Sequence, residues 1–81
     1  MHEYTLIQNL IEEVHIKMKE RKASKLKLIE LHVGESSGYS KENLKQAFDI
    51  LITETEFKDA ELKLTSIDGS DIYLQSFVLE E

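Results

Sequence analysis

The sequence predicts an α/β (α+β) fold in which two helices pack on one face of a three-stranded mixed sheet. Apolar residues recur at helical spacing in two segments and alternate with polar residues in three shorter ones, in the order helix, strand, helix, strand, strand. The 81 residues include 41% hydrophobic residues and no cysteine. We therefore expect a single domain over residues 1–81, with one small core and no disulfide support.

The first predicted helix runs from about Thr5 to Lys22. Residues three and four positions apart form its apolar stripe: Leu6, Ile7, Leu10, Ile11, Val14 and Met18. Thr5 is followed three residues later by Gln8, which resembles a capping box. The helix is therefore expected to begin at or just before Thr5 and to leave residues 1–3 as a short extension.

A strand is expected over residues 26–33, which are rich in Leu, Ile and Val. The apolar residues of odd number from 29 to 33 share one face of this strand. Leu26 and Leu28 have the other parity, which indicates a β-bulge. The glycine-bounded segment 34–38 is expected to be a loop.

A second helix is expected after Ser40, because serine is a favourable N-cap. Its apolar stripe consists of Leu44, Ala47, Phe48, Leu51 and Ile52, and it is expected to fray near residues 53–55. Residues 60–65 and 72–79 have the alternation of strands, and Asp68-Gly69 between them is a tight-turn signal. The last two strands are therefore expected to form a hairpin.

The first three residues, Met1-His2-Glu3, bring together groups that bind metals. The α-amino nitrogen, the backbone nitrogens of His2 and Glu3, and the His2 imidazole can hold one ion in fused chelate rings, a set that suits square-planar Ni(II) or Cu(II). The Glu3 carboxylate would adjust the charge of the site or pass the ion on. Because these nitrogens must lose protons to bind, affinity is expected to fall with pH. The competing interpretation is a solvated, unstructured chain start.

Charge and hydropathy argue against two classes of partner. Sixteen acidic residues outnumber ten basic ones and give a net charge of −6, whereas nucleic-acid binding needs a positive surface. The sequence has no apolar stretch that approaches the roughly 18 residues of a membrane span and no signal-peptide pattern. We therefore expect a soluble cytoplasmic protein that binds neither nucleic acid nor a membrane.

The remaining polar residues give no catalytic pattern. Ser36 and Ser37 lie in a glycine-flanked loop that lacks a nucleophile elbow, an assigned base and the lysine of a phosphate-binding loop. His15 and His32 have neither a histidine four residues later nor an adjacent pair of carboxylates, so both are expected to be ordinary surface or half-buried residues. The sequence therefore predicts a protein that is not an enzyme.

The assembled pattern resembles the HypA/HybF family of nickel metallochaperones. The matching segments are Met1-His2-Glu3-Tyr4, Val33-Gly34-Glu35-Ser36-Ser37-Gly38, Ala47-Phe48, Ala60-Glu61-Leu62 and Tyr73-Leu74-Gln75-Ser76. This resemblance covers nearly the whole chain. It implies that Met1, His2 and Glu3 bind nickel for the maturation of [NiFe]-hydrogenase or urease, and that the partners are a nickel-handling GTPase and the hydrogenase large subunit. Glu42 is a further candidate ligand, although this chain has Ser40-Lys41-Glu42 where some members place an acidic residue.

One departure from the family pattern is large. Members carry a zinc domain with two Cys-x-x-Cys pairs between the last two strands, and here that domain is absent between about residues 66 and 71, so no zinc is expected. Loss in a natural lineage and an engineered join at Gly69-Ser70 both fit. The alternative function is an interaction or scaffold module of the same fold that no longer handles metal. A monomer and a strand-swapped dimer are both compatible with the sequence.

Overall fold

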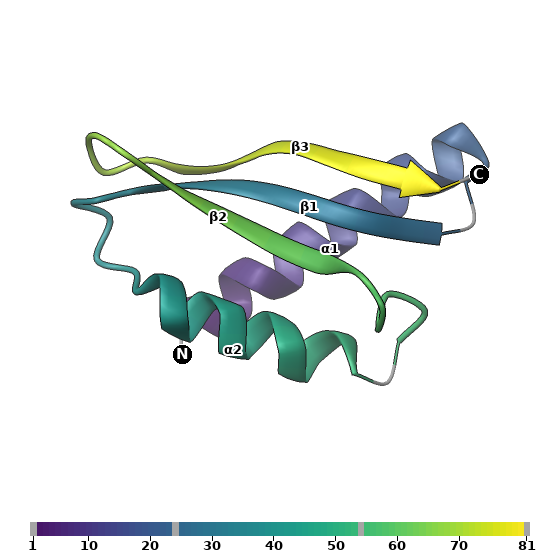
Figure 1. Cartoon of the computed structure of the whole chain (residues 1–81), viewed down its shortest axis with the longest axis horizontal. Coiled ribbons are helices and arrows are strands. Elements are labelled where there is room, and N and C mark those ends of the chain that lie inside the picture. The colour runs from purple at the N-terminus through teal and green to yellow at the C-terminus, as the bar shows by residue number, and fades with distance from the viewer. Residues whose placement is uncertain (1, 24, 54, 81) are drawn as a thin grey trace.

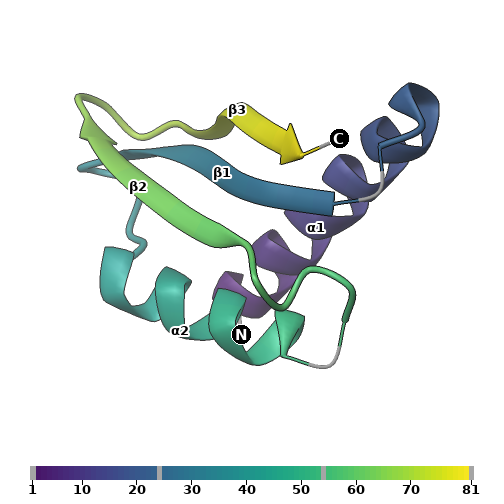
Figure 2. The same cartoon turned by 45° about the vertical axis from the view of Figure 1, so that its right-hand side comes forward.

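The computed structural model describes residues 2–23, 25–53 and 55–80, although not the side chain of His2. In these residues the chain forms two helices and three strands, and both helices lie on the same face of the sheet (Figures 1 and 2). The elements are α1 (His2–Arg21), β1 (Lys25–Gly34), α2 (Lys41–Ile52), β2 (Glu61–Ile67) and β3 (Ile72–Glu80). The predicted class and element order are confirmed.

The strand order of the described sheet is β2-β1-β3, with β2 parallel and β3 antiparallel to the central β1. The predicted hairpin of the last two strands is therefore wrong. The turn signal at Asp68-Gly69 is real, since Gly69 has a φ of 92°, but the turn carries the chain across the end of β1 instead of back along β2. A local turn sequence specifies a change of direction and does not specify which strand becomes the neighbour. β1 takes the central place, where its apolar residues are covered most completely.

The connection between β2 and β3 is bonded to the chain that leaves β1. The amides of Gly34, Glu35 and Ser36 donate to carbonyl oxygens of Asp71, Ile67 and Gly69 at 2.6, 2.9 and 2.8 Å, respectively. A Cβ atom on Gly34 would collide with the Gly69 carbonyl oxygen and would lie 2.6 Å from that of Asp71. Only glycine therefore permits this crossing.

The predicted bulge in β1 is confirmed. The register between β1 and β3 shifts between Leu26 and Leu28, so Lys27 is the extra residue of β1. This extra residue turns Leu26 toward the helices, where its side chain is 2% exposed, whereas Leu28 is half-buried on the outer face. A second shift makes Gln75 the extra residue of β3.

The helix ends correct one boundary and confirm another. α1 begins at His2, three residues earlier than predicted, so Glu3 is part of its first turn and Thr5 lies inside the helix. An acidic residue in the first turn is favourable because it faces the positive end of the helix dipole. Ser40 is the N-cap of α2 as predicted, and its Oγ accepts a hydrogen bond from the Asn43 amide at 3.2 Å.

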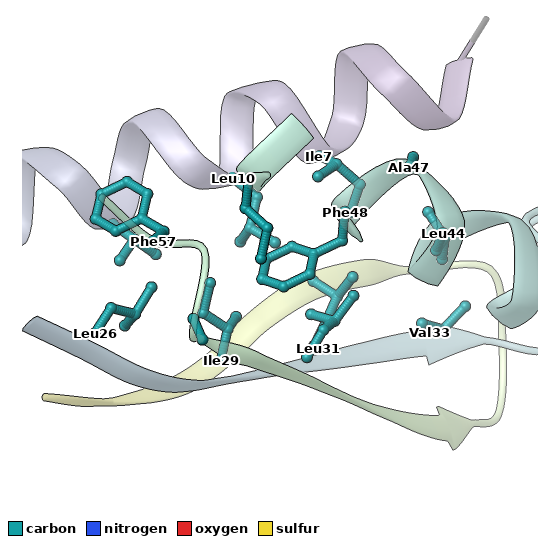
Figure 3. Packing of buried hydrophobic residues seen from close by; sticks show 14 of the residues in the cluster. Ile7, Leu10, Leu26, Ile29, Leu31, Val33, Leu44, Ala47, Phe48 and Phe57 are labelled. Atoms are coloured by element: carbon teal, nitrogen blue, oxygen red, sulfur yellow. The ribbon is translucent and has the colours of Figure 1, made fainter. Parts of the chain in front are cut away.

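The hydrophobic core lies between the two helices and the inner face of the sheet (Figure 3). Phe48 of α2 is 1% exposed and lies at its centre, between Ile7 and Leu10 of α1 and Leu31 of β1. Phe57 and Ala60, in the segment before β2, extend the core toward the end of the sheet where β2 begins. This core fixes the position of α1, and hence of the turn that carries Glu3 and the backbone of His2.

Candidate functional site

The candidate site lies where the first turn of α1 meets α2. Glu3 and Tyr4 are half-buried, and Tyr4 packs against the core. Together with Asn43, Gln46 and Ala47 of α2 they line a hollow of about 190 Å³. Met1 and the His2 side chain, two of the predicted ligands, lie outside what the structure describes. The structure therefore anchors Glu3 and the backbone of His2 on a packed helix.

The backbone of this turn supplies nitrogen groups that the helix does not use. The first four N–H groups of an α-helix have no intrahelical acceptor, and these include the amides of His2 and Glu3. The same turn lies at the positive end of the helix dipole, which disfavours a bare cation. A metal bound through deprotonated amides avoids this penalty, because each amide that loses its proton contributes one negative charge. An ion at this end of the helix would therefore need nitrogen anions as ligands and could not be held by simple electrostatic attraction.

Glu42 is not brought into the hollow. It lies exposed in the first turn of α2, and its neighbour Asn43 lines the hollow with Glu3. Among residues 2–23, 25–53 and 55–80, no group of three His, Cys, Asp or Glu side chains is arranged to hold a metal ion. The Glu42 ligand stays a prediction that the structure does not support with a contact.

His15 has a carboxylate partner that sequence reasoning missed. Its Nδ1 lies 3.2 Å from Oε1 of Glu56, and its ring meets that of Phe57 edge to face at 5.7 Å. These contacts tie the middle of α1 to the segment that follows α2. Glu56 is 41 residues away in the sequence, so no spacing pattern could have predicted the pair.

His32 belongs to a polar cluster on the outer face of the sheet. Its Nε2 lies 3.2 Å from Oε2 of Glu30 and its Nδ1 3.2 Å from the Tyr73 hydroxyl. The Thr65 hydroxyl donates to the same carboxylate oxygen at 3.2 Å. Glu30 and His32 are two residues apart on one strand and share a face, a signal that sequence reasoning could have used. Thr65 and Tyr73 come from the neighbouring strands and depend on the register.

The hydrogen bond from His32 holds the pKa of Glu30 below its ordinary value, with smaller help from Lys63 and Thr65 against the opposing effect of burial. A lowered pKa in the folded state means that this contribution is present at neutral pH and is lost as the pH falls below about 4. We therefore expect Glu30→Gln to flatten the loss of stability between pH 6 and pH 3. Urea unfolding at several pH values measures this, and identical pH dependence in both proteins would contradict it.

Comparison with known proteins identifies the family. A family model described as hydrogenase/urease nickel incorporation, metallochaperone, hypA matches residues 1–71. Proteins named hydrogenase maturation factor HypA from Dehalococcoides mccartyi and Prosthecochloris aestuarii are 36% identical over 67 residues and 34% identical over 65 residues. These matches cover 83% and 80% of this chain but only 56% and 58% of the relatives. The chain thus spans little more than half the length of these relatives.

Two solved structures share the fold. The solution structure of the nickel metallochaperone HypA from Helicobacter pylori has a TM-score of 0.74 at 24% identity, over 91% of this chain and 70% of that one. A second solution structure of a HypA protein has a TM-score of 0.71 at 26% identity, over 94% and 71%.

These matches belong to one family of metallochaperones, whose description names the incorporation of nickel into hydrogenase or urease. The chain belongs to this HypA family. The resemblance of the sequence to HypA/HybF proteins is confirmed. Among the residues that the structure describes, neither helix has the length and apolar character needed to span a bilayer.

Proposed function

We propose that this chain is a nickel-binding metallochaperone domain, a non-catalytic cytoplasmic carrier that delivers Ni(II) for the maturation of [NiFe]-hydrogenase or urease. The observation that supports it best is that the family match begins at residue 1 and so includes the N-terminal turn. In this proposal residues 1–81 are a single nickel-binding domain without zinc, because the sequence contains no cysteine and only residues 68–71 connect β2 to β3.

In the proposed site the ligands are the amine of Met1, the backbone nitrogens of His2 and Glu3, and the His2 imidazole. The deprotonated amides offset the charge of the ion at the positive end of α1. Glu3 is half-buried and lines the hollow, and in this proposal its carboxylate contributes further negative charge beside the ion. Such a site is open on one side, and a carrier needs that openness to release its cargo to a partner.

Nickel titration of the untagged chain tests this proposal. We expect one equivalent of Ni(II) to bind and to give the yellow absorbance of a square-planar site. His2→Ala should weaken binding at least tenfold in calorimetry. A Gly-Ser extension ahead of Met1 should weaken it as much, because the Met1 nitrogen then forms a peptide bond and is no longer a free amine. Affinity should also fall between pH 8 and pH 6, because the amine and the imidazole then keep their protons.

His15→Ala is the matched control, because His15 lies on the same helix and has a carboxylate partner of its own. It should leave nickel binding unchanged. Equal losses in the His15 and His2 variants, or unchanged affinity in the extended protein, would contradict the proposed ligands. No nickel binding at all by the untagged chain would favour the scaffold module instead.

The proposed partners are a nickel-handling GTPase and the hydrogenase large subunit. We infer that they dock on the exposed side of α1 near the N-terminus, because docking there brings a receiving site beside the ion. Mapping of NMR chemical-shift changes on addition of the GTPase tests this placement. Changes confined to residues 68–71, which connect β2 to β3, would contradict it.

A further inference from the structure

The open edge of β3 lacks most of the features that normally protect an edge strand, apart from the β-bulge at Gln75. Edge strands usually carry charges, proline or a covering element that prevents pairing with another chain. Residues 72–79, Ile-Tyr-Leu-Gln-Ser-Phe-Val-Leu, contain no charged residue, proline or glycine, although 32% of the whole chain is charged. β2, the other edge of the described sheet, carries Glu61 and Lys63. β3 is the edge strand on the other side of β1, and it lies along the upper side of the sheet in both views (Figures 1 and 2).

The inner side of β3 is also incompletely covered. The side chains of β3 that face the helices are all half-buried: Ile72, Leu74, Phe77 and Leu79. Their counterparts in β1 are at most 3% exposed. Two hollows remain between β3 and α1, one of about 340 Å³ beside Ile72 and Leu74 and one of about 400 Å³ beside Phe77 and Leu79. Apolar surface beside an unpaired strand edge is what an added strand would bury.

The pattern of β3 is symmetric about the bond between Gln75 and Ser76. Read from either end of residues 72–79, half-buried and exposed positions follow in the same order, because Gln75 and Ser76 are both exposed. Residues opposite each other in an antiparallel pair share a face. If this strand met a copy of itself about that centre, each inward residue would face an inward one, Ile72 opposite Leu79 and Leu74 opposite Phe77. Each outward residue would face an outward one, Tyr73 opposite Val78 and Gln75 opposite Ser76.

The charges beside the two hollows are complementary under the same symmetry. Glu13 of α1 lines the hollow beside Ile72 and Leu74. Arg21 of α1 lines the other hollow, where its guanidinium lies 5.2 Å from the centre of the Phe77 ring. Two-fold pairing brings the first hollow of one copy against the second hollow of the other, and with it Glu13 toward Arg21.

We propose that β3 pairs antiparallel with β3 of a second copy of this chain, about a two-fold axis between Gln75 and Ser76, to form a continuous six-stranded sheet. At the rim, Glu80 would lie opposite Asp71 of the other copy. Lys25, 3.8 Å from Glu80, compensates part of that charge. The interface is isologous, since the same surface serves both copies. It lies along β3, away from the hollow that Glu3 lines with α2, so nickel binding and pairing can be tested separately.

Two double variants at the same exposed positions test this pairing. Gln75→Lys/Ser76→Lys places like charges opposite each other twice, whereas Gln75→Lys/Ser76→Glu places opposite charges there twice. We expect the wild type and the lysine-glutamate variant to dimerise in sedimentation equilibrium. The dissociation constant of the double-lysine variant should be about tenfold higher than that of the wild type or more, because like charges directly opposite are destabilising. Equal dimerisation of the two variants, or a monomeric wild type at all concentrations, would overturn the proposal.

The register is tested by cysteine pairs, which are unambiguous because the chain has no cysteine of its own. A mixture of Tyr73→Cys and Val78→Cys chains should form a mixed disulfide on mild oxidation, since opposite Cα atoms lie within disulfide reach. Either variant alone should crosslink much less, because each residue is then about five positions from its copy. A dimer that gives no mixed disulfide in this experiment would overturn the proposed register and its axis.

Discussion

Replacing Gly34 by alanine is expected to destabilise the fold by about 2–3 kcal/mol, the range of an overpacked site that cannot relax. The atoms that the new Cβ would meet are all backbone: the carbonyl oxygen of Gly69 and the oxygen and nitrogen of Asp71, the last two at 2.6 and 2.9 Å. The Asp71 oxygen also accepts the Gly34 amide at 2.6 Å. The crossing connection would have to move away and give up that bond. Urea unfolding monitored by circular dichroism measures the loss.

Gly38 provides the control. Glycine is favoured there by the backbone conformation, whereas at Gly34 it is required by the lack of space for a side chain. Gly38 has a φ of 86° and an added Cβ would meet nothing within 4 Å. Gly38→Ala should cost about 1 kcal/mol from backbone conformation alone, and Gly38→Asn less. Two glycines inserted after Gly69 should partly rescue Gly34→Ala, because a longer connection can bow outward. Equal losses at both glycines, or no rescue, would contradict a collision with the connection.

Phe48→Ala is expected to have the larger effect, about 3–5 kcal/mol, which is usual for removing a buried aromatic side chain. Phe48 is 1% exposed and fills the space between α1 and β1 (Figure 3). At about 0.05–0.15 kcal/mol per residue, a chain of 81 residues has only about 4–12 kcal/mol of stability. Loss of the ring should therefore leave a substantial unfolded population. The midpoint of thermal unfolding and the dispersion of NMR signals measure it.

Ile50→Ala is the matched control for Phe48. Both residues lie on α2, but Ile50 is 59% exposed, so truncation there should change the stability by no more than about 0.5 kcal/mol. If the two variants were equally stable, the core could not be centred on Phe48. If Ile50→Ala were the more damaging, a surface that packs against another molecule would be indicated.

Elements governed by local patterns could be predicted from the sequence. Ser40 stands directly before an amphipathic segment, and the helix begins there because its hydroxyl accepts the Asn43 amide. The parity change between Leu26 and Ile29 revealed the bulge because side chains alternate strictly along a strand. The start of α1 was misplaced because Thr5 and Gln8 match a capping box. In the structure the helix begins three residues earlier, at His2, so Thr5 is not its N-cap.

Features that depend on the register of distant strands could not be predicted. Nothing in residues 60–79 shows that β1 will separate the last two strands, since an Asp-Gly turn, although typical of a hairpin, here connects two strands that are not neighbours. The cluster of Glu30, His32, Thr65 and Tyr73 could not be predicted for the same reason, because its members come from three strands whose order and register were unknown. The N-terminal ligands are a different case. Their capacity to bind a metal could be inferred from the residue types of Met1-His2-Glu3 alone. The structure adds that Glu3 lies on a packed helix beside α2.

The central place of β1 has a consequence for synthesis on the ribosome. Its parallel neighbour and both helices are complete by residue 67, but its antiparallel neighbour spans residues 72–80. A nascent chain can therefore assemble only a two-stranded intermediate, in which Leu26 and Ile29 lack cover along one flank, until residues 72–80 leave the exit tunnel. A product stalled or terminated before residue 72 would therefore expose an unpaired strand edge to chaperones and proteases.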